Sequence, residues 1–386
     1  MYGGDALSRV EGRVVLTPFL LPGETARVEV EQERADLLRA RPVEIVSPAA
    51  ERVEPRCPYF QKCGGCHYQH AEYSFQVAQK AEILREQLKR VGKIDFTGEI
   101  ATISGEPFGY RNRTQFHVDG SKIGFFHAGS HELLAVDQCP ISSPKINEVL
   151  GVLHEMAADR QWPPFLKSIE VFTNESEVLL NVDSGHPLAR RFFDWSSERI
   201  PGAARGYLEY KVGDDSYRVS HNSFFQVNRF LVDQLVEIAL EGATGSSALD
   251  LYAGVGLFSV HLARKFAHVT TVESGKGSIR DLEVNAIGAN VALEGVGQSV
   301  ETFLPSVTDS PDFVLADPPR AGLGKVVTRE LLRIKPRVIN IVACDPATLA
   351  RDLGVLTGGG YKLESLTMID LFPQTYHLEA VARLVL

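Results

Sequence analysis

The sequence predicts an α/β protein with a doubly wound parallel sheet in its C-terminal part and β-rich units before it. From about Phe225 onward, short apolar runs alternate with helical segments, which is typical of a doubly wound sheet. Residues 8–47 and 108–220 instead hold strand-like runs separated by turns, which predicts smaller, largely antiparallel sheets. A chain of 386 residues is long enough for such units to be separate domains.

The N-terminal part begins with β-structure and continues into a helix. Residues 8–47 alternate apolar and polar positions around the turn L-P-G-E at 21–24, so we expect a small β-barrel or sheet. Residues 48–58 are rich in proline and charge and are expected to form a linker. Apolar residues then recur at helical spacing, at Val77, Ala81, Leu84, Leu88 and Val91. This spacing predicts a helix that ends at Gly92.

Three apolar strands in the C-terminal part each end beside a segment with distinctive chemistry. They cover residues 248–251, 313–316 and 338–343. The carboxyl ends of parallel strands meet at one edge of a sheet, where ligands of open α/β folds bind. We therefore expect the segments that follow these strands to form one site.

Charge and hydropathy disfavour some classes of protein. The formal net charge is −9 at pH 7, which argues against a protein that is basic throughout and binds nucleic acid by bulk charge. Arginines and lysines are frequent in about the first hundred residues, where they form either a local basic face or an ordinary solvated surface. No stretch has the length of a membrane span, so we expect a cytoplasmic protein with no membrane partner.

The five cysteines divide into three plus one, and a lone residue. Cys57, Cys63 and Cys66 lie in C-P-Y-F-Q-K-C-G-G-C, and Cys139 follows in D-Q-C-P-I. Thiolates grouped in this way suit a metal centre. Disulfides are the alternative, and the odd count and the lack of a secretory leader disfavour them. Cys344 stands alone in I-V-A-C-D-P-A-T, which suits either a catalytic nucleophile or a small buried side chain.

A glycine turn follows the strand at 248–251. The segment Y-A-G-V-G at 252–256 leads into a helix expected to begin near Leu257, and glycines at such a turn let the backbone approach a ligand closely. Glu273 ends the next strand, where a carboxylate accepts hydrogen bonds from ribose hydroxyls about 20 residues after the turn. Nicotinamide enzymes and methyl-donor enzymes both use this arrangement, and a glycine turn beside an exposed glutamate is the alternative without a ligand.

The strand at 313–316 runs into the segment D-P-P-R at 317–320. In enzymes that methylate exocyclic amines, a similar D-P-P is followed by an aromatic residue that stacks on the target base. Arg320 occupies that place here. The sequence therefore disfavours amine methylation and indicates methylation of carbon.

Methylation of carbon-5 of uracil needs a nucleophile and a base. A thiolate must first add at carbon-6, because only then is carbon-5 nucleophilic enough to attack a methyl sulfonium. Cys344 follows the strand at 338–343, and a helix beginning at Pro346 is expected to lower the pKa of its thiol. Glu379, in D-L-F-P-Q-T-Y-H-L-E, is the candidate base for the carbon-5 proton, with a solvated strand position as its alternative.

Together these motifs resemble the RNA uracil-5-methyltransferases, specifically the iron–sulfur members that act on 23S ribosomal RNA. The resemblance covers nearly the whole chain. It is carried by D-L-F-P-Q-T-Y-H-L-E, D-P-P-R-A-G, C-D-P-A-T-L-A-R-D-L and C-P-Y-F-Q-K-C-G-G-C-H-Y-Q-H. The N-terminal V-E-G-R-V-V-L-T-P-F-L-L-P-G-E is similar to the family's TRAM domain, an oligonucleotide-binding-type β-barrel.

The resemblance implies three domains. Residues 1–50 would form the TRAM barrel, and residues 51–222 an antiparallel β-rich central domain that carries a [4Fe-4S] cluster. Residues 223–386 would form a class I, Rossmann-like methyltransferase domain, against which the helix within residues 70–100 would pack.

The resemblance also implies residue roles, with Cys344 as nucleophile and Glu379 as base. The residues implied in contacts with S-adenosylmethionine are Gln226, Tyr252, Gly254, Glu273 and Asp317. The implied cluster ligands are Cys57, Cys63, Cys66 and Cys139. Zinc is the alternative, with His67 as a further ligand, although the first gap of five residues is longer than in most zinc sites.

The implied substrate is 23S rRNA, and the enzyme is expected to be a monomer. The barrel and the arginine-bearing segments would bind phosphates. The target uridine would flip into the site, where Phe224 or Phe225 could stack on it. Two other functions stay open: a tRNA uracil-5-methyltransferase with the same chemistry, and an inactive iron–sulfur RNA-binding protein.

Overall fold

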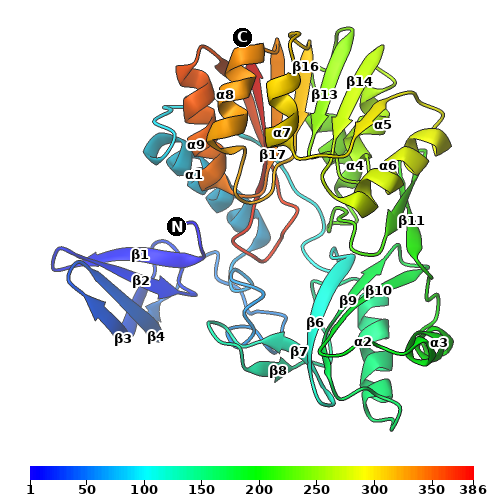
Figure 1. The fold of residues 1–386 in the computed structure, drawn as a ribbon. Helices are drawn as coiled ribbons and strands as arrows, with labels where there is room; N and C mark the ends of the chain where they lie inside the picture. Colours follow the sequence, from blue (N-terminus) through cyan, green and yellow to red (C-terminus); the bar gives the residue numbers. More distant parts are fainter.

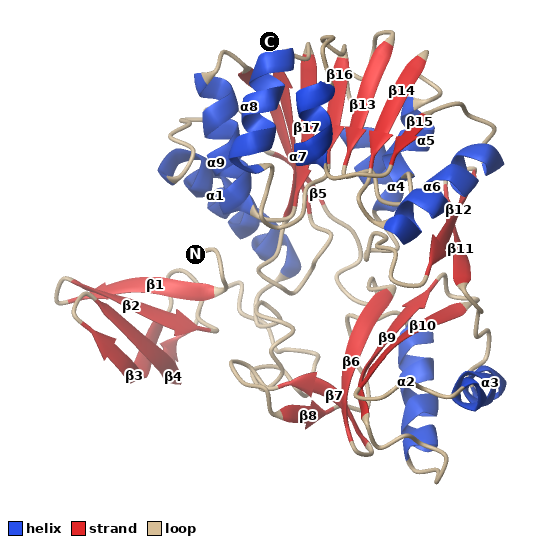
Figure 2. Cartoon of the chain, in the orientation of Figure 1, coloured by secondary structure: helices blue, strands red, loops and turns tan.

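A computed structural model describes residues 1–386 as an N-terminal sheet, a central domain and a larger α/β domain (Figure 1). Figure 2 shows the N-terminal sheet projecting to one side, with the α/β domain and the central domain at opposite ends of the molecule. None of the helices is both long enough and apolar enough to cross a bilayer.

The N-terminal unit is a four-stranded sheet with the order β1-β2-β4-β3. Its strands are β1 (Asp5–Val10), β2 (Arg13–Pro18), β3 (Thr25–Arg34) and β4 (Leu37–Ser47). Strands β2 and β4 are parallel, and the other two pairs are antiparallel. The expected β-structure is confirmed, but the edge strands β1 and β3 share no ladder, so hydrogen bonds do not close the sheet into a barrel.

The central domain contains a five-stranded antiparallel sheet with the order β10-β9-β6-β7-β8, as the sequence predicts. Its strands are β6 (Arg113–Asp119), β7 (Lys122–Phe126), β8 (Leu133–Ala135), β9 (Leu166–Thr173) and β10 (Val178–Ser184). Two helices that were not expected accompany it, α2 (Pro144–Ala157) and α3 (Arg190–Arg199). Leu150 of α2 packs with Phe116 and Ile169 in the core of this domain.

The C-terminal part forms a doubly wound sheet of eight strands, in the order β15-β14-β13-β16-β17-β19-β18-β5. Its strands after residue 240 are β13 (Ser247–Leu251), β14 (His268–Val272), β15 (Glu294–Val296), β16 (Phe313–Ala316), β17 (Val338–Ala343), β18 (Lys362–Ile369) and β19 (Glu379–Val385). Strands β13 to β17 run parallel, and β19 lies antiparallel between β17 and β18. The strand order reverses between β13 and β16, and such a switch point is where open α/β sheets bind ligands.

Helices cover both faces of this sheet (Figure 2). They are α4 (Val232–Ala239), α5 (Leu257–Leu262), α6 (Lys276–Gly288), α7 (Val300–Phe303), a 3₁₀ turn (Leu304–Ser306), α8 (Gly324–Ile334) and α9 (Pro346–Gly358). Residues of α8 and α9 are buried in one apolar cluster, and residues of α4 and α5 in a second. A hairpin of β11 (Tyr207–Val212) and β12 (Asp215–Ser220) contributes to the second cluster.

A segment that precedes the central domain completes the α/β domain. Helix α1 (Tyr73–Arg90) packs beside α9, and its Leu84 and Leu88 are fully buried in the same cluster as α8 and α9. Strand β5 (Ala101–Ile103) then pairs in parallel with β18 at the edge of the sheet. The predicted helix and its packing on the C-terminal domain are confirmed, whereas the pairing of β5 with that sheet was not expected.

Candidate active site

The strand register brings the predicted nucleophile and base together. Ala343, the last residue of β17, pairs with Ala380 of β19 in an antiparallel ladder. The next residues, Cys344 and Glu379, therefore lie opposite each other, and side chains at opposite positions of such a ladder are close neighbours. Asp317 follows the neighbouring parallel strand β16 at the same edge. All three side chains consequently meet at the carboxyl edge of the sheet.

The environment of Cys344 raises the pKa of its thiol to about 12, first through burial and then through the carboxylates Glu379 and Asp317. The prediction of a lowered pKa is therefore wrong. Helix α9 does begin after this cysteine, but Asp345 caps it. The Asp345 Oδ1 atom accepts the N–H groups of Ala347 at 3.0 Å and Thr348 at 2.8 Å. A carboxylate thus occupies the donors that would otherwise favour a thiolate.

The carboxyl groups at this edge also favour their neutral forms. Burial and the nearby Asp317 raise the pKa of Glu379 well above its ordinary value. Burial and Asp250 raise the pKa of Asp317 to about 7. Without its substrates, the site therefore tends toward an uncharged thiol and uncharged carboxyls at neutral pH. Binding of a cation beside them would shift the carboxyls toward the anionic form.

Asp250 is a functional candidate that the sequence reasoning missed. It lies within β13 with no exposed surface, and burial raises its pKa to about 7. Its Oδ2 atom accepts a hydrogen bond from Ser259 Oγ at 2.5 Å, whereas Oδ1 has no partner. The signal in the sequence is a carboxylate inside the apolar strand A-L-D-L.

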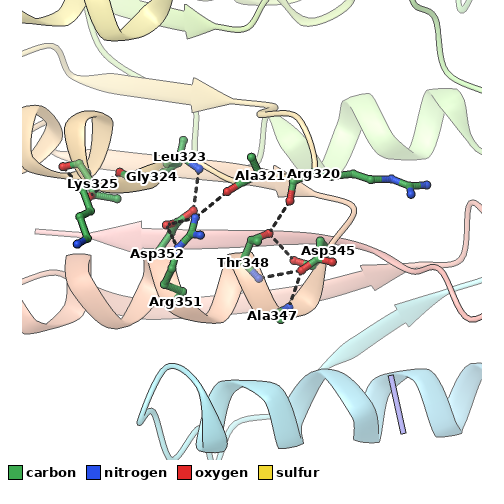
Figure 3. A network of polar contacts seen from close by, with 11 residues as sticks. Arg320, Ala321, Leu323, Gly324, Lys325, Asp345, Ala347, Thr348, Arg351 and Asp352 are labelled. Atoms are coloured by element: carbon green, nitrogen blue, oxygen red, sulfur yellow. Dashed lines mark hydrogen bonds and ion pairs between the residues drawn. The ribbon is translucent and has the colours of Figure 1, made fainter. Parts of the chain in front are cut away.

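The segments that follow β16 and β17 are bonded to each other (Figure 3). Thr348 Oγ1 donates to the carbonyl oxygen of Arg320 at 3.2 Å, and Arg351 Nη2 donates to that of Ala321 at 2.8 Å. Asp352 Oδ2 accepts the N–H of Leu323 at 2.7 Å. Figure 3 shows the Arg320 side chain extending away from this network. The bonds fix the D-P-P-R-A-G segment against the helix that begins beside Cys344.

The glycine turn after β13 has the backbone that the sequence predicts. Tyr252, Gly254 and Gly256 have φ values of 64°, 56° and 88°, in the left-handed region that glycine adopts without strain. Glu273 holds this turn, because its Oε2 atom accepts the N–H of Gly254 at 2.9 Å. Its Oε1 atom accepts the N–H of Gly275 at 2.5 Å. A carboxylate has further lone pairs for ribose hydroxyls. The Tyr252 hydroxyl is buried without a hydrogen-bond partner.

Gln226 lies on a segment that joins α6 to the turn before Glu379. At one end, Ser223 Oγ donates to Asp281 of α6 at 2.9 Å, and at the other, Asn228 Nδ2 donates to the carbonyl of Leu371 at 3.2 Å. The two phenylalanines between them differ. Phe225 is buried against Tyr210 in the core, whereas Phe224 is 59% exposed. Of the two, only Phe224 has a ring that is free to stack on a base.

Cys57, Cys63, Cys66 and Cys139 line one cavity of about 190 Å³. The backbone around it is fixed, because the N–H of Cys139 donates to Asn147 Oδ1 at 2.8 Å and that of Cys57 donates to Gln69 Oε1 at 3.1 Å. Burial raises the pKa of the thiols of Cys57 and Cys66, and that of Cys63 to about 11.

The four thiols line this cavity without converging on one point. No group of three or more His, Cys, Asp or Glu side chains is close enough together to hold a metal ion, so the geometry does not confirm the expected metal centre. His67 is absent from the cavity lining and packs against Tyr376 instead, with 4.6 Å between ring centroids. The structure therefore does not support His67 as a further zinc ligand.

Comparison with known proteins places this site in a family. The family model described as tRNA (Uracil-5-)-methyltransferase matches residues 207–385. An uncharacterized RNA methyltransferase of Aquifex aeolicus is 31% identical over 420 residues, which cover 100% of this chain and 96% of that protein. The chain belongs to the RNA uracil-5-methyltransferase family.

Two further relatives of this RNA uracil-5-methyltransferase carry more specific descriptions. The 23S rRNA (uracil(1939)-C(5))-methyltransferase RlmD of Edwardsiella ictaluri is 31% identical over 411 residues, covering 98% of this chain and 92% of that protein. The crystal structure of Pyrococcus abyssi tRNA (uracil-54, C5)-methyltransferase in complex with S-adenosyl-L-homocysteine superposes with a TM-score of 0.79. That protein is 28% identical, and the match covers 99% of this chain and 98% of the other.

Proposed function

We propose that this RNA uracil-5-methyltransferase methylates carbon-5 of a uridine in 23S rRNA, with S-adenosylmethionine as the donor. The observation that supports the chemistry best is the placement of Cys344 opposite Glu379 and beside Asp317 at the switch-point edge of the sheet. The similarity to RlmD over 98% of the chain favours ribosomal RNA. The structural likeness to a tRNA enzyme keeps tRNA as the second candidate.

The donor would occupy the glycine turn after β13. Gly254 allows close backbone approach there, Glu273 would accept from the ribose hydroxyls, and Tyr252 offers a hydroxyl without a partner. The positive sulfonium would lower the pKa of Asp317 and Glu379, because an opposite charge nearby favours the ionised carboxylate. Donor binding would thereby help to make Glu379 a base. The support for S-adenosylmethionine is the bound S-adenosyl-L-homocysteine of the Pyrococcus abyssi structure.

The reaction begins when the Cys344 sulfur bonds to carbon-6 of the uracil. This addition moves the electron pair of the 5,6 double bond onto carbon-5 as an enolate. Carbon-5 then attacks the methyl group of the donor, and S-adenosylhomocysteine leaves. Glu379 removes the proton from carbon-5, the double bond re-forms, and the bond between sulfur and carbon-6 breaks. Because the pKa of the Cys344 thiol is raised in the substrate-free enzyme, we expect loss of its proton to be coupled to substrate binding.

We also propose that Cys57, Cys63, Cys66 and Cys139 hold a [4Fe-4S] cluster with a structural role. The support is a donor set made only of sulfur around one cavity. A single zinc ion needs ligands that converge on one point, whereas the irons of a cluster keep the thiolates apart. The cluster would tie residues 57–66 to Cys139. Anaerobic purification should yield iron and a visible absorption band; a colourless protein with bound zinc would contradict this assignment.

The decisive test of the chemistry uses one variant of Cys344 and one of Glu379. Cys344→Ala should abolish methylation while RNA binding stays near wild type, because the nucleophile is lost and the phosphate contacts remain. Glu379→Gln should transfer the methyl group and then stall, so that a covalent protein–RNA adduct accumulates on a denaturing gel. Wild-type turnover by Cys344→Ala, or no adduct with Glu379→Gln, would contradict the mechanism.

The substrate is tested in cells. Mass spectrometry of 23S rRNA and of tRNA from a strain that lacks the gene should show 5-methyluridine lost from the ribosomal RNA and retained in tRNA. Loss from tRNA alone would establish the second candidate instead.

A further inference from the structure

The turn that precedes Glu379 is held from outside the methyltransferase sheet. Residues 370–378 connect β18 to β19, and Glu379 is the first residue of β19. We refer to residues 370–378 as the base turn. Its shape decides how the Glu379 carboxylate enters the site, and neither β18 nor β19 supplies the contacts at its centre.

Gln374, at the centre of the base turn, is buried and has φ of 69°. A side chain other than glycine adopts this left-handed conformation only where the surroundings determine it. Here the carbonyl oxygen of Gln374 accepts two backbone hydrogen bonds, from the N–H of His67 at 2.8 Å and of Tyr68 at 3.0 Å. Both donors directly follow Cys66, so the cysteine segment 57–68 is bonded to the base turn.

A side-chain contact from α1 secures the same residue. Gln76 is buried, and its Oε1 atom accepts the N–H of Gln374 at 3.1 Å. Its Nε2 group donates to Gln374 Oε1 at 3.0 Å and to the carbonyl of Ala71 at 2.8 Å. Gln76 thus satisfies the backbone and the side chain of Gln374 at once, and it also fixes the chain just after the cysteine segment.

We propose that Gln76 and Gln374 are positioning residues, which hold the base turn so that Glu379 faces Cys344 and which make this geometry depend on the order of the cysteine segment. The proposal rests on the function proposed above. It gives the cysteine segment a mechanical part in the last chemical step, removal of the carbon-5 proton, without any electron transfer.

Gln76 and Gln374 should affect one step of the reaction more than the others. Addition of Cys344 and transfer of the methyl group do not use Glu379, whereas proton removal does. A displaced base turn should therefore slow product release from the covalent adduct more than it slows methyl transfer. A general loss of folded enzyme would lower both rates together and would not accumulate the adduct.

The test compares Gln76→Ala with Gln79→Ala, Glu379→Gln and wild type. Gln79 lies on the same helix, is half-buried and makes no hydrogen bond to the base turn, so it is a matched control. For Gln76→Ala we expect single-turnover methyl transfer within about twofold of wild type. Steady-state turnover should fall roughly 10- to 100-fold, with a covalent adduct on a denaturing gel. Gln79→Ala should match wild type in all three measurements.

Hydrogen–deuterium exchange of the same proteins supplies a readout that is independent of activity. Gln76→Ala should accelerate exchange both in peptides that cover residues 66–69 and in peptides that cover residues 370–378, because it loosens both sides of the contact. Faster exchange confined to α1 would overturn the proposal. Should Gln76→Ala fail to fold, Gln374→Gly replaces it, since glycine tolerates the positive φ and keeps the carbonyl while removing the side-chain bond.

The outcomes distinguish this proposal from the proposed function. One outcome would overturn the positioning role and leave the function standing. In it, Glu379→Gln accumulates the adduct, whereas folded Gln76→Ala accumulates none and turns over at the same rate as Gln79→Ala. Failure of Glu379→Gln itself to accumulate an adduct would overturn the assignment of the base and the positioning role with it.

Discussion

At Cys344 the local environment outweighs the effect expected from the helix that follows. Burial and two carboxyl neighbours raise the pKa of the thiol, and Asp345 takes the first free N–H groups of α9. A neutral thiol is also less open to oxidation than a thiolate. If Cys344 is the nucleophile, as we propose, the site keeps it in a form protected from oxidation until the substrates arrive.

Asp250 makes the stability of the ligand-free enzyme depend on pH. Its pKa rises from an ordinary 3.8 to about 7 in the folded protein. A raised folded-state pKa means that its stabilising contribution is complete below about pH 4 and is lost as the pH rises through about 7. Over that window the free energy of unfolding should fall by on the order of 1 kcal/mol per pH unit from this group alone.

Asp250→Asn should flatten this dependence, because an amide carries no charge and still accepts the bond from Ser259. Melting temperature measured between pH 4 and 8 tests the expectation. Asp309→Asn, at an exposed position, is the control and should keep the slope of wild type. A slope in Asp250→Asn equal to that of the control would show that other groups cause the dependence.

At the scale of elements, a buried ion pair fastens α1 to the base turn. Lys80 Nζ lies 2.7 Å from Asp370 Oδ1 with both side chains fully buried, and it also donates to the carbonyl of Phe372 at 3.0 Å. Burial lowers the pKa of Lys80 while Asp370 opposes that shift. The pair fixes how α1 lies against the base turn, because any arrangement that separates the two buried charges is strongly disfavoured.

Lys80→Ala should destabilise the enzyme by about 3–5 kcal/mol, because it leaves the Asp370 carboxylate buried without a counterion. The free energy of unfolding from urea titration measures this. The control is Lys89→Ala on the same helix, whose contact with Asp95 is exposed and which should change stability by less than about 1 kcal/mol. A similar small effect for Lys80→Ala would mean that water reaches the pair.

The sequence predicted the elements whose signals are local. Strands 313–316 and 338–343, the helices beginning at Leu257 and Pro346, and the place of Glu273 after β14 agree with the structure. It missed contacts between distant segments, such as Gln76 with Gln374 and Lys80 with Asp370. A polar residue on a helix has the same local pattern whether it faces water or a buried partner, so these pairs required the fold.

At the scale of the whole molecule, the N-terminal unit reaches the candidate active site. The Tyr2 hydroxyl donates to Asp345 Oδ2 at 3.1 Å. The Tyr2 ring packs edge-to-face with that of Tyr376, with 5.5 Å between the ring centroids. Most arginines of the N-terminal sheet form ion pairs with carboxylates of the same sheet, among them Arg27 with Glu44 and Arg41 with Glu29. Because neighbouring carboxylates neutralise these arginines, the sheet is rich in arginine without being strongly basic.

Arg9 and Arg34 are exposed on this sheet and form no ion pair. If the sheet binds RNA through phosphates, the double variant Arg9→Gln/Arg34→Gln should weaken binding. It should also reduce the slope of log affinity against log salt by roughly 0.7 to 0.9 per lost contact. Filter binding at several salt concentrations measures both. Arg41→Gln, which removes an already paired arginine, is the control; an unchanged slope in the double variant would place the phosphate contacts elsewhere.

The insertion of the central domain between β5 and the rest of its sheet has a consequence for how the protein is made. Helix α1 and β5 leave the ribosome early, yet their partners in α9 and β18 are among the last segments to be synthesised. Until then Leu84 and Leu88 have no apolar surface to cover them. The nascent chain therefore exposes this apolar surface through most of translation, and a stop codon shortly before α9 would leave it permanently uncovered and prone to aggregation.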